Sequence, residues 1–160
     1  MSLELKVLDP RILAWGFPHH GSALSVGLDL HACLDAPLHL APGGPPALVS
    51  AGFALRIGDP DWCGIVAPRS GLGHRGLVLG NTIGVIDADY EGPLTLSLWN
   101  RNAAGGDAIA IEPGDRVAQL LLVRVSRPDM TIVTEFTGAS GRGAGGFGST
   151  GVRPAGDEEP

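Results

Sequence analysis

Glycine and proline break this chain into short apolar runs, and that spacing limits the folds open to it. The 160 residues include 25 glycines and 13 prolines, many of them clustered between the runs, as at residues 42–46, 58–60 and 113–114. Both residue types end strands and form turns. The runs show almost no helical periodicity. We therefore expect about ten short strands in an all-β domain, a sandwich or barrel such as a distorted jelly roll.

The expected strands lie between these turns. They cover residues 3–8, 26–32, 38–40, 47–57, 62–67, 77–86, 94–100, two segments within 109–125, and 130–136. Residues 70–76 hold at most one helical turn. The runs 77–86 and 94–100 flank residues 87–93, which predicts a hairpin with a long loop.

Composition separates a folded domain from a tail. Hydrophobic residues make up 44% of the chain and charged residues 18%, enough to build one core. From Thr137 onward the sequence is rich in glycine and has little to bury. We expect a domain over residues 1–136 and a flexible glycine-rich C-terminal arm over residues 137–160.

Charge and hydropathy exclude several classes of protein. The formal net charge is −6, which argues against a nucleic-acid binder. No run is long enough to span a membrane, and no signal-peptide pattern is present. Cys33 and Cys63 fit free thiols in a reducing compartment better than a disulfide framework. We expect a cytoplasmic protein that acts without a membrane or nucleic acid. The five histidines lack metal-ligand spacing.

Two segments follow strands and could bind an anion or do acid–base chemistry. Arg69, Ser70 and Gly71 end an apolar strand and offer charged, hydroxyl and backbone donors, although an ordinary strand-to-turn junction is the favoured interpretation of this motif alone. Asp87 and Asp89 would share one face of an extended strand, and two nearby carboxylates raise one pKa. Solvated turn aspartates are the simpler interpretation.

Two further segments carry polar groups that need an explanation. Gln119 begins an apolar strand, so its amide needs a backbone or ligand partner. Asp115 and Arg116, just before it, could simply pair at the surface. Residues 142–151 combine Arg142, glycines and two hydroxyls with the isolated Phe147, which suits phosphate binding and base stacking but, taken alone, equally suits a flexible linker.

Together these segments resemble the five motifs of the dUTP pyrophosphatase family, at residues 27–32, 68–72, 84–92, 114–119 and 142–151. The resemblance implies hydrolysis of dUTP to dUMP and pyrophosphate by a jelly-roll homotrimer. Its active sites would lie between subunits and be closed by the C-terminal arm. Alternatives are a dCTP deaminase or bifunctional deaminase on the same fold, a non-catalytic binding or regulatory protein, and a structural jelly-roll module.

The resemblance also implies residue roles. Asp87 would be the general base that orients the attacking water, and Mg²⁺ the cofactor, without a direct protein ligand. Asp29 would reach the metal through water or act only as a structural partner of Arg69. The expected base and sugar contacts are Asn81, Gly84, Val85, Ile86, Tyr90 and Phe147. The expected phosphate contacts are Arg69, Ser70, Gly71, Gln119, Arg142, Gly148, Ser149 and Thr150.

Overall fold

The computed structural model describes residues 2–138, 141 and 143–144. The chain divides into two compact units, Met1–Arg127, which we call the core unit, and Pro128–Pro160. The start of the expected arm, at residue 137, falls inside the second unit. None of the helices in the described residues has the length and apolar character needed to cross a membrane.

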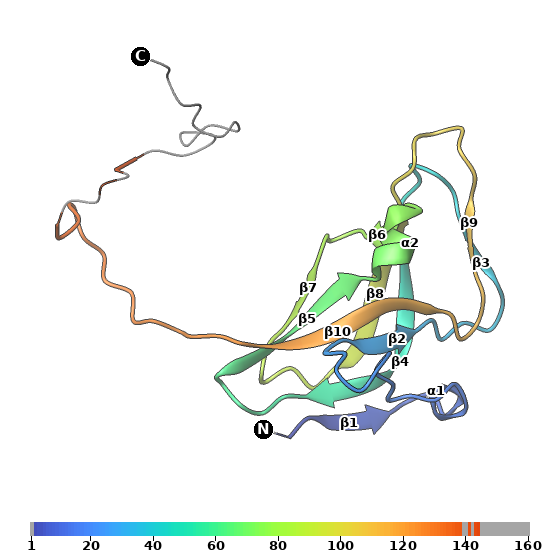
Figure 1. Cartoon of the computed structure of the whole chain (residues 1–160), viewed down its shortest axis with the longest axis horizontal. Coiled ribbons are helices and arrows are strands. Elements are labelled where there is room, and N and C mark those ends of the chain that lie inside the picture. The colour runs from blue at the N-terminus through green and yellow to red at the C-terminus, as the bar shows by residue number, and fades with distance from the viewer. Residues whose placement is uncertain (1, 139–140, 142, 145–160) are drawn as a thin grey trace, which may run out of the picture. The chain divides into compact units, whose positions relative to one another are not determined.

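The core unit is an all-β sandwich with two short helices (Figure 1). One sheet has the strand order β1-β4-β8-β6, the other β2-β10-β5-β7, and β3 pairs with β9 in a two-stranded ribbon. All pairings are antiparallel. The elements are β1 (Glu4–Val7), α1 (Arg11–Ala14), β2 (Leu28–His31), β3 (Leu38–Leu40), β4 (Ala47–Arg56), β5 (Trp62–Pro68), α2 (Ser70–His74), β6 (Leu77–Leu79), β7 (Gly84–Ile86), β8 (Pro93–Asn100), β9 (Ile109–Ile111) and β10 (Arg116–Arg124).

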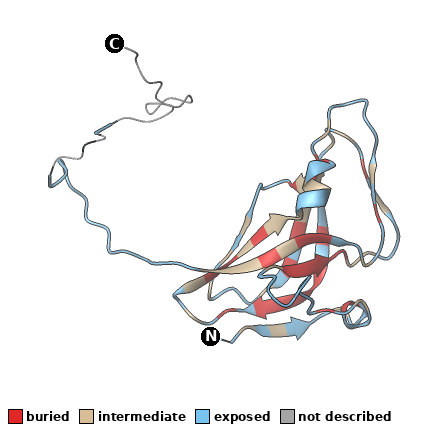
Figure 2. Cartoon of the chain, in the orientation of Figure 1, coloured by how far each residue is buried: buried red, intermediate tan, exposed pale blue. Residues whose placement is uncertain are grey.

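The core lies between the two four-stranded sheets, where Figure 2 shows the buried residues concentrated on the strands. On β8 the side chains alternate, with Leu94, Leu96 and Leu98 buried and the residues between them more exposed. That alternation is what a half-buried strand requires, because successive side chains point to opposite faces. The all-β fold expected from the sequence is confirmed.

The β5–β10 pair forms the longest continuous ladder in the sheet that carries most of the candidate residues. Seven residue pairs connect the strands, from Ala118 opposite Pro68 to Arg124 opposite Trp62. On its other side, β10 pairs with β2 across a register shift between Arg116 and Ala118. The irregularity changes the direction of the strand start, where Arg116 lies.

Two expectations about residues 77–100 are wrong. The run 77–86 is two strands, β6 and β7, separated by a turn. The hairpin partner of β7 is also not β8: β7 pairs with β5, and β8 pairs with β4 and β6. Neighbouring strands in the sequence thus belong to different sheets. Asp89 lies in the turn after β7, so it does not share a strand face with Asp87.

The strand expected at residues 130–136 does not form. The segment has no strand pairing among the described residues, and Met130, Ile132 and Phe136 are at least nine-tenths exposed. Its alternation suits a strand, but a strand also needs a neighbour to satisfy its backbone groups. Within its own unit the described residues provide none.

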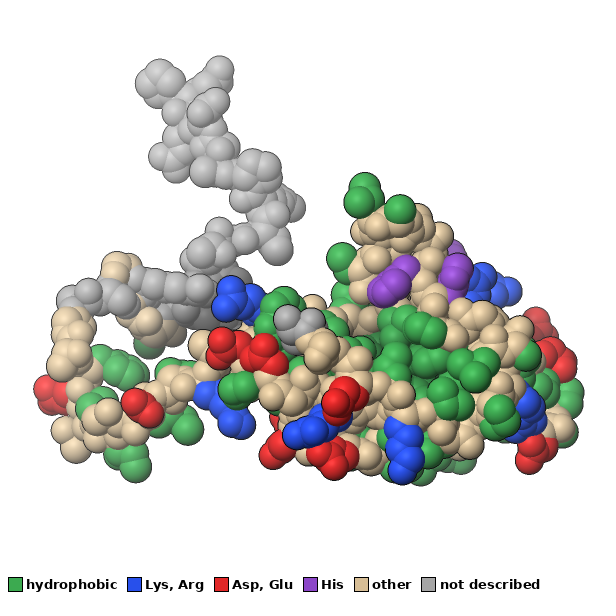
Figure 3. Space-filling model, turned by 90° about the horizontal axis from the view of Figure 1, so that it is seen from below, with side chains coloured by type: hydrophobic (Ala, Val, Ile, Leu, Met, Phe, Trp, Pro, Cys, Tyr) green, Lys and Arg blue, Asp and Glu red, His purple; other side chains and the backbone are tan. Residues whose placement is uncertain are grey.

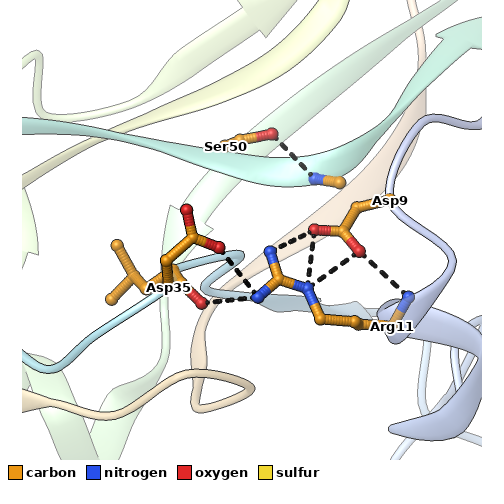
Figure 4. Close-up of polar contacts among 6 residues, drawn as sticks. Asp9, Arg11, Asp35 and Ser50 are labelled. Carbon is orange, nitrogen blue, oxygen red and sulfur yellow. Dashed lines mark hydrogen bonds and ion pairs between the residues drawn. The ribbon is translucent and has the colours of Figure 1, made fainter.

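Helix α1, which the sequence pattern did not predict, is held by a charged cluster (Figure 4). The Arg11 guanidinium donates to Asp9, reaches Asp35 at 3.0 Å and donates to the Leu34 carbonyl at 3.0 Å. The hydrogen bond from Arg11 holds the pKa of Asp9 below its usual value. Beside the cluster, Gly52 N donates to Ser50 Oγ in a tight bend of β4. A four-residue helix depends on such contacts because its own hydrogen bonds are too few.

Surface charge is mixed. On the face shown in Figure 3, basic side chains stand beside acidic ones, and the ion pairs Arg56–Glu4 and Arg56–Glu91 are examples within the core unit.

Candidate functional site

Strand pairing brings three of the sequence motifs into one row. Gln119 on β10 lies opposite Asp29 on β2 and opposite Ala67 on β5. The residues that follow Ala67 lead through Arg69, the N-cap of α2, to Ser70 and the first turn of that helix. Residues that are far apart in sequence therefore meet at one end of the β2-β10-β5-β7 sheet.

Asp29 is the centre of this row. Its carboxylate is buried, and each oxygen has its own arginine: Oδ1 lies 3.1 Å from Nε of Arg69, and Oδ2 lies 2.9 Å from Nη1 of Arg116. We call these three residues the arginine–aspartate cluster. A buried carboxylate is tolerated only when it is paired in this way. The alternative of a surface pair between Asp115 and Arg116 is wrong, since Asp115 Oδ2 accepts from the Glu112 amide.

The Gln119 amide is held by backbone. Its Nε2 donates to the Pro68 carbonyl at 3.0 Å. A Cβ at Gly27 would collide with Oε1 of the same side chain, so a larger residue there would require the Gln119 amide to move. The amide nitrogen thus has the backbone partner that the sequence position demanded.

Next to the cluster lies a cleft of about 650 Å³, which we call the basic cleft. Arg69, Arg75 and Arg116 line it, together with Asp107 and Asp115. Planar guanidinium groups match phosphate oxygens in geometry and charge. Arg69 is one-third exposed there, so part of its donor fork is open to a ligand.

A second and smaller cavity of about 140 Å³ lies between β7 and β8, and we call it the β7–β8 pocket. The two strands belong to different sheets. Four predicted base contacts meet in the pocket, and four residues of β8 line its other wall. The lining residues are Val66, Leu79, Asn81, Gly84, Val85, Ile86, Leu94, Thr95, Leu96 and Ser97.

The turn that precedes β7 is strained. Thr82 has φ of 64°, in the left-handed region that a β-branched residue rarely adopts. Its hydroxyl donates to the Asn81 carbonyl. Such outliers cost about 1–3 kcal/mol and persist where the surrounding structure fixes them. The strain lies directly beside Asn81, a predicted base contact.

Tyr90 and Asp87 lie in the loop after β7. The Tyr90 hydroxyl donates to the Pro93 carbonyl at 2.9 Å, and its ring packs so closely on Gly92 that a Cβ there would lie 2.7 Å from Cζ. Asp87 is exposed, and its carboxylate makes no hydrogen bond or ion pair within the described part of the chain. Its backbone carbonyl accepts from Tyr90 N.

The predicted site residues thus form two groups in one chain. Arg69 and Gln119 lie with Asp29 at one end of the sheet, with Ser70 and Gly71 exposed at the start of α2. The base contacts lie around the β7–β8 pocket. The two cavities have no lining residue in common. Predictions for Arg142, Phe147, Gly148, Ser149 and Thr150 lie outside the described residues.

Sequence reasoning missed Arg116, Thr95 and Ser97. The two β8 residues carried a usable signal, because Thr95 and Ser97 alternate with buried leucines and so form the second face of an apolar strand. Arg116 lies inside the 114–119 motif, but its partner Asp29 is 87 positions away, so nothing local in the sequence indicated their contact.

Among the described residues, no group of three or more His, Cys, Asp or Glu side chains could hold a metal ion. Both Asp29 oxygens already contact arginines. This donor set fits Mg²⁺ held mainly by substrate phosphates and water, the way that ion usually binds.

Comparison with known proteins gives a consistent result. A family model described as dUTPase matches residues 14–151. The chain is 54% identical to the deoxyuridine 5'-triphosphate nucleotidohydrolase of Xylella fastidiosa strain M12, over 94% of this chain and 96% of that one. It is 52% identical to the enzyme of the same name from Xanthomonas oryzae pv. oryzae strain PXO99A, over 95% and 96%.

A solved structure of Staphylococcus bacteriophage 80alpha dUTPase with dUPNHPP shares the fold. The TM-score is 0.80 at 26% identity, with 94% of this chain and 99% of that chain covered.

Proposed function

Since this chain belongs to the dUTPase family, we propose that it hydrolyses dUTP to dUMP and pyrophosphate. The observation that carries the proposal is the β7–β8 pocket, a small cavity whose one wall is an edge strand. Its volume of about 140 Å³ suits a single pyrimidine ring, and residues resembling the family's uracil contacts line it.

Base selection in this proposal depends on backbone. Strand β7 has β5 on one side only, so the N–H and C=O groups of its other edge are available to a base. Gly84 and Val85 would present them, with the Asn81 amide beside them. A close backbone approach leaves no room for a 5-methyl group and so rejects thymine.

The sugar lies against Tyr90. Its hydroxyl is tied to the Pro93 carbonyl, which keeps the ring in one orientation. A fixed ring against the sugar excludes a 2'-hydroxyl by contact.

The triphosphate would bind at the other group of residues. Arg69, Ser70, Gly71 and Gln119 supply charged, hydroxyl, backbone and amide donors, and the basic cleft adds positive charge. Such fixed donors stabilise the charge that develops on the leaving pyrophosphate.

Asp87 acts as the base. Its carboxylate takes a proton from a water whose oxygen attacks the α-phosphorus, and the bond from that phosphorus to the oxygen that bridges to the β-phosphorus breaks in line. Exposure supports this role, because the Asp87 carboxylate has no partner among the described residues and its oxygens are open to a water.

We propose Mg²⁺ as the cofactor, held by phosphate oxygens and water. When bound, it would neutralise phosphate charge. A solved dUTPase from phage phi11 of S. aureus, with 23% identity, is described as coordinating a structural Mg(II) ion. A contact from Asp29 to the ion through water stays a prediction.

A homotrimer with shared sites completes the proposal. The two groups of site residues line separate cavities, which fits a site formed when subunits bring them together. Met130, Ile132 and Phe136 are exposed apolar side chains suited to a subunit contact. We propose that residues 1–136 form the domain and 137–160 the closing arm.

The arm has a direct test. Truncation after Phe136 should leave a folded trimer, measured by light scattering, with greatly reduced turnover because the γ-phosphate grip of Arg142, Ser149 and Thr150 is lost. In the full chain, Phe147→Trp should change fluorescence when dUTP analogue stacks on it. Full activity of the truncated protein, or an unchanged signal at saturation, contradicts the arm's role.

We also propose a cytoplasmic location without nucleic-acid partners. Cys33 and Cys63 are free thiols, as expected in a reducing compartment. The net charge of −6 would repel a nucleic-acid backbone.

The function is tested by a substrate panel. Purified protein with Mg²⁺ receives dUTP, UTP, dTTP or dCTP, and pyrophosphate and ammonia are both measured. Pyrophosphate from dUTP, well above the other three, is the expected result. Ammonia from dCTP would indicate the deaminase instead. No dUMP from dUTP would refute the proposal.

A further inference from the structure

Arg116 lines the basic cleft and also contacts the most buried charge of the site. Its Nη1 lies 2.9 Å from Oδ2 of Asp29, while its own side chain stays 42% exposed and lines the basic cleft. A surface arginine has many exposed conformations to choose from. The contact with the buried Asp29 carboxylate therefore fixes the Arg116 side chain in one of them.

Asp29 connects Arg116 to Arg69. Nε of Arg69 lies 3.1 Å from Oδ1 of Asp29, and Nη1 of Arg69 donates to the Arg116 carbonyl at 3.2 Å. Arg116 is therefore linked to Arg69 in two ways. Its side chain shares the Asp29 carboxylate with Arg69, and its backbone carbonyl accepts a hydrogen bond from Arg69. The other N–H groups of Arg69 have no partner among the described residues and remain available to an anion.

The contact of Arg116 with Oδ2 limits how Arg69 can bind the Asp29 carboxylate. An arginine and a carboxylate prefer a two-point contact in which both oxygens are used. Here Oδ2 is already occupied by Arg116. Without that contact the carboxylate could turn and take a second N–H group of Arg69, and the fork would rotate away from the cleft.

We propose that Arg116 is a positioning residue for dUTP hydrolysis, because it occupies Oδ2 of Asp29 and so keeps the free donors of Arg69 directed at the triphosphate. The inference rests on the proposed function. A small displacement of such a donor lowers turnover strongly, since the reaction depends on fixed geometry.

A purely stabilising ion pair would look the same in the structure but behave differently on mutation. It would lower the unfolding midpoint and leave the kinetic constants of the folded enzyme unchanged. A positioning role predicts the reverse, with kinetics altered in a protein that is still folded at the assay temperature.

The test uses Arg116→Gln, Arg116→Lys and the control Arg124→Gln in the full chain. Arg124 lies on the same strand, where it is 74% exposed and reaches Asp61 only at 4.0 Å. Arg116→Gln should lower kcat/KM for dUTP by about 10- to 100-fold. Arg116→Lys should recover part of the loss, and Arg124→Gln should match wild type in kcat and KM.

A double-mutant cycle with Arg69→Gln shows whether the effect passes through Arg69. If it does, Arg116→Gln should add little to the loss that Arg69→Gln already causes. Additive losses would overturn the inference, as would an Arg116→Gln enzyme equal to Arg124→Gln. A loss matched by unfolding, with no recovery in Arg116→Lys, would overturn it too. A wild type that yields no dUMP would instead refute the proposed function.

Discussion

The two halves of the candidate site are held in place in different ways. In the arginine–aspartate cluster, charged side chains fix one another, with a buried carboxylate between two arginines. Around the β7–β8 pocket the backbone is the fixed part, through a three-residue pairing with β5 and a strained turn at Thr82. Asp87, at the end of that strand, is exposed and has no side-chain partner in the described residues.

This difference indicates which substitutions should impair each half of the site. Side chains that fix one another fail when any one is replaced. A site made from backbone groups loses binding only when a substitution changes the backbone conformation. An unpaired carboxylate can be replaced without structural cost, so its loss should appear in chemistry alone.

Asp87→Asn should have the largest effect. Asparagine keeps the shape but cannot accept the proton, so kcat for dUTP should fall by about 100- to 10,000-fold, with affinity for dUPNHPP and the unfolding midpoint preserved. Asp89→Asn, two residues on and equally exposed, is the matched control and should stay near wild type. Near-normal kcat in Asp87→Asn would remove it from the base role.

Gly84→Ala should have an intermediate effect on binding. Its Cβ would lie 3.1 Å from Cβ of Val66, a tight contact, so we expect a small shift of β7 against β5 that changes the pocket wall. KM for dUTP should rise by about 10-fold. Gly21→Ala, where the nearest atom is Ser25 Oγ at 3.6 Å, provides the control. An unchanged KM in Gly84→Ala would mean that the backbone of β7 does not contact the base.

Thr82→Gly should have the smallest effect. Glycine adopts a φ of 64° freely, so relief of strain should outweigh the added chain entropy, and the free energy of unfolding should rise by about 1 kcal/mol. The freed turn should also raise KM slightly. Chemical denaturation and steady-state kinetics measure the two effects, and a less stable variant would show that Thr82 is not strained.

Much of the fold follows from turn chemistry in the sequence. The expected ends of β3 coincide with the observed strand, and the split at residues 112–115 separates β9 from β10. Strand pairing could not be predicted from the sequence in the same way. Adjacency in sequence favoured β7 with β8, whereas packing of two sheets decides which edges meet.

The candidate site shows the same limit. Motif order indicated Asp29, Arg69 and Gln119 as separate elements, but their meeting depends on the β2–β10–β5 register. The positive φ of Thr82 could not be predicted from the sequence, because threonine does not favour the left-handed region. Both features arise from tertiary contacts rather than from local propensity.

Strand β7 pairs only with β5, and its other edge borders the β7–β8 pocket. This arrangement affects how the site can change in evolution. Amide and carbonyl groups are common to every residue except proline, so most single substitutions along this wall leave its hydrogen-bonding pattern intact. Base preference would thus be buffered against drift in the gene. An altered preference would first require a residue that redirects the chain itself.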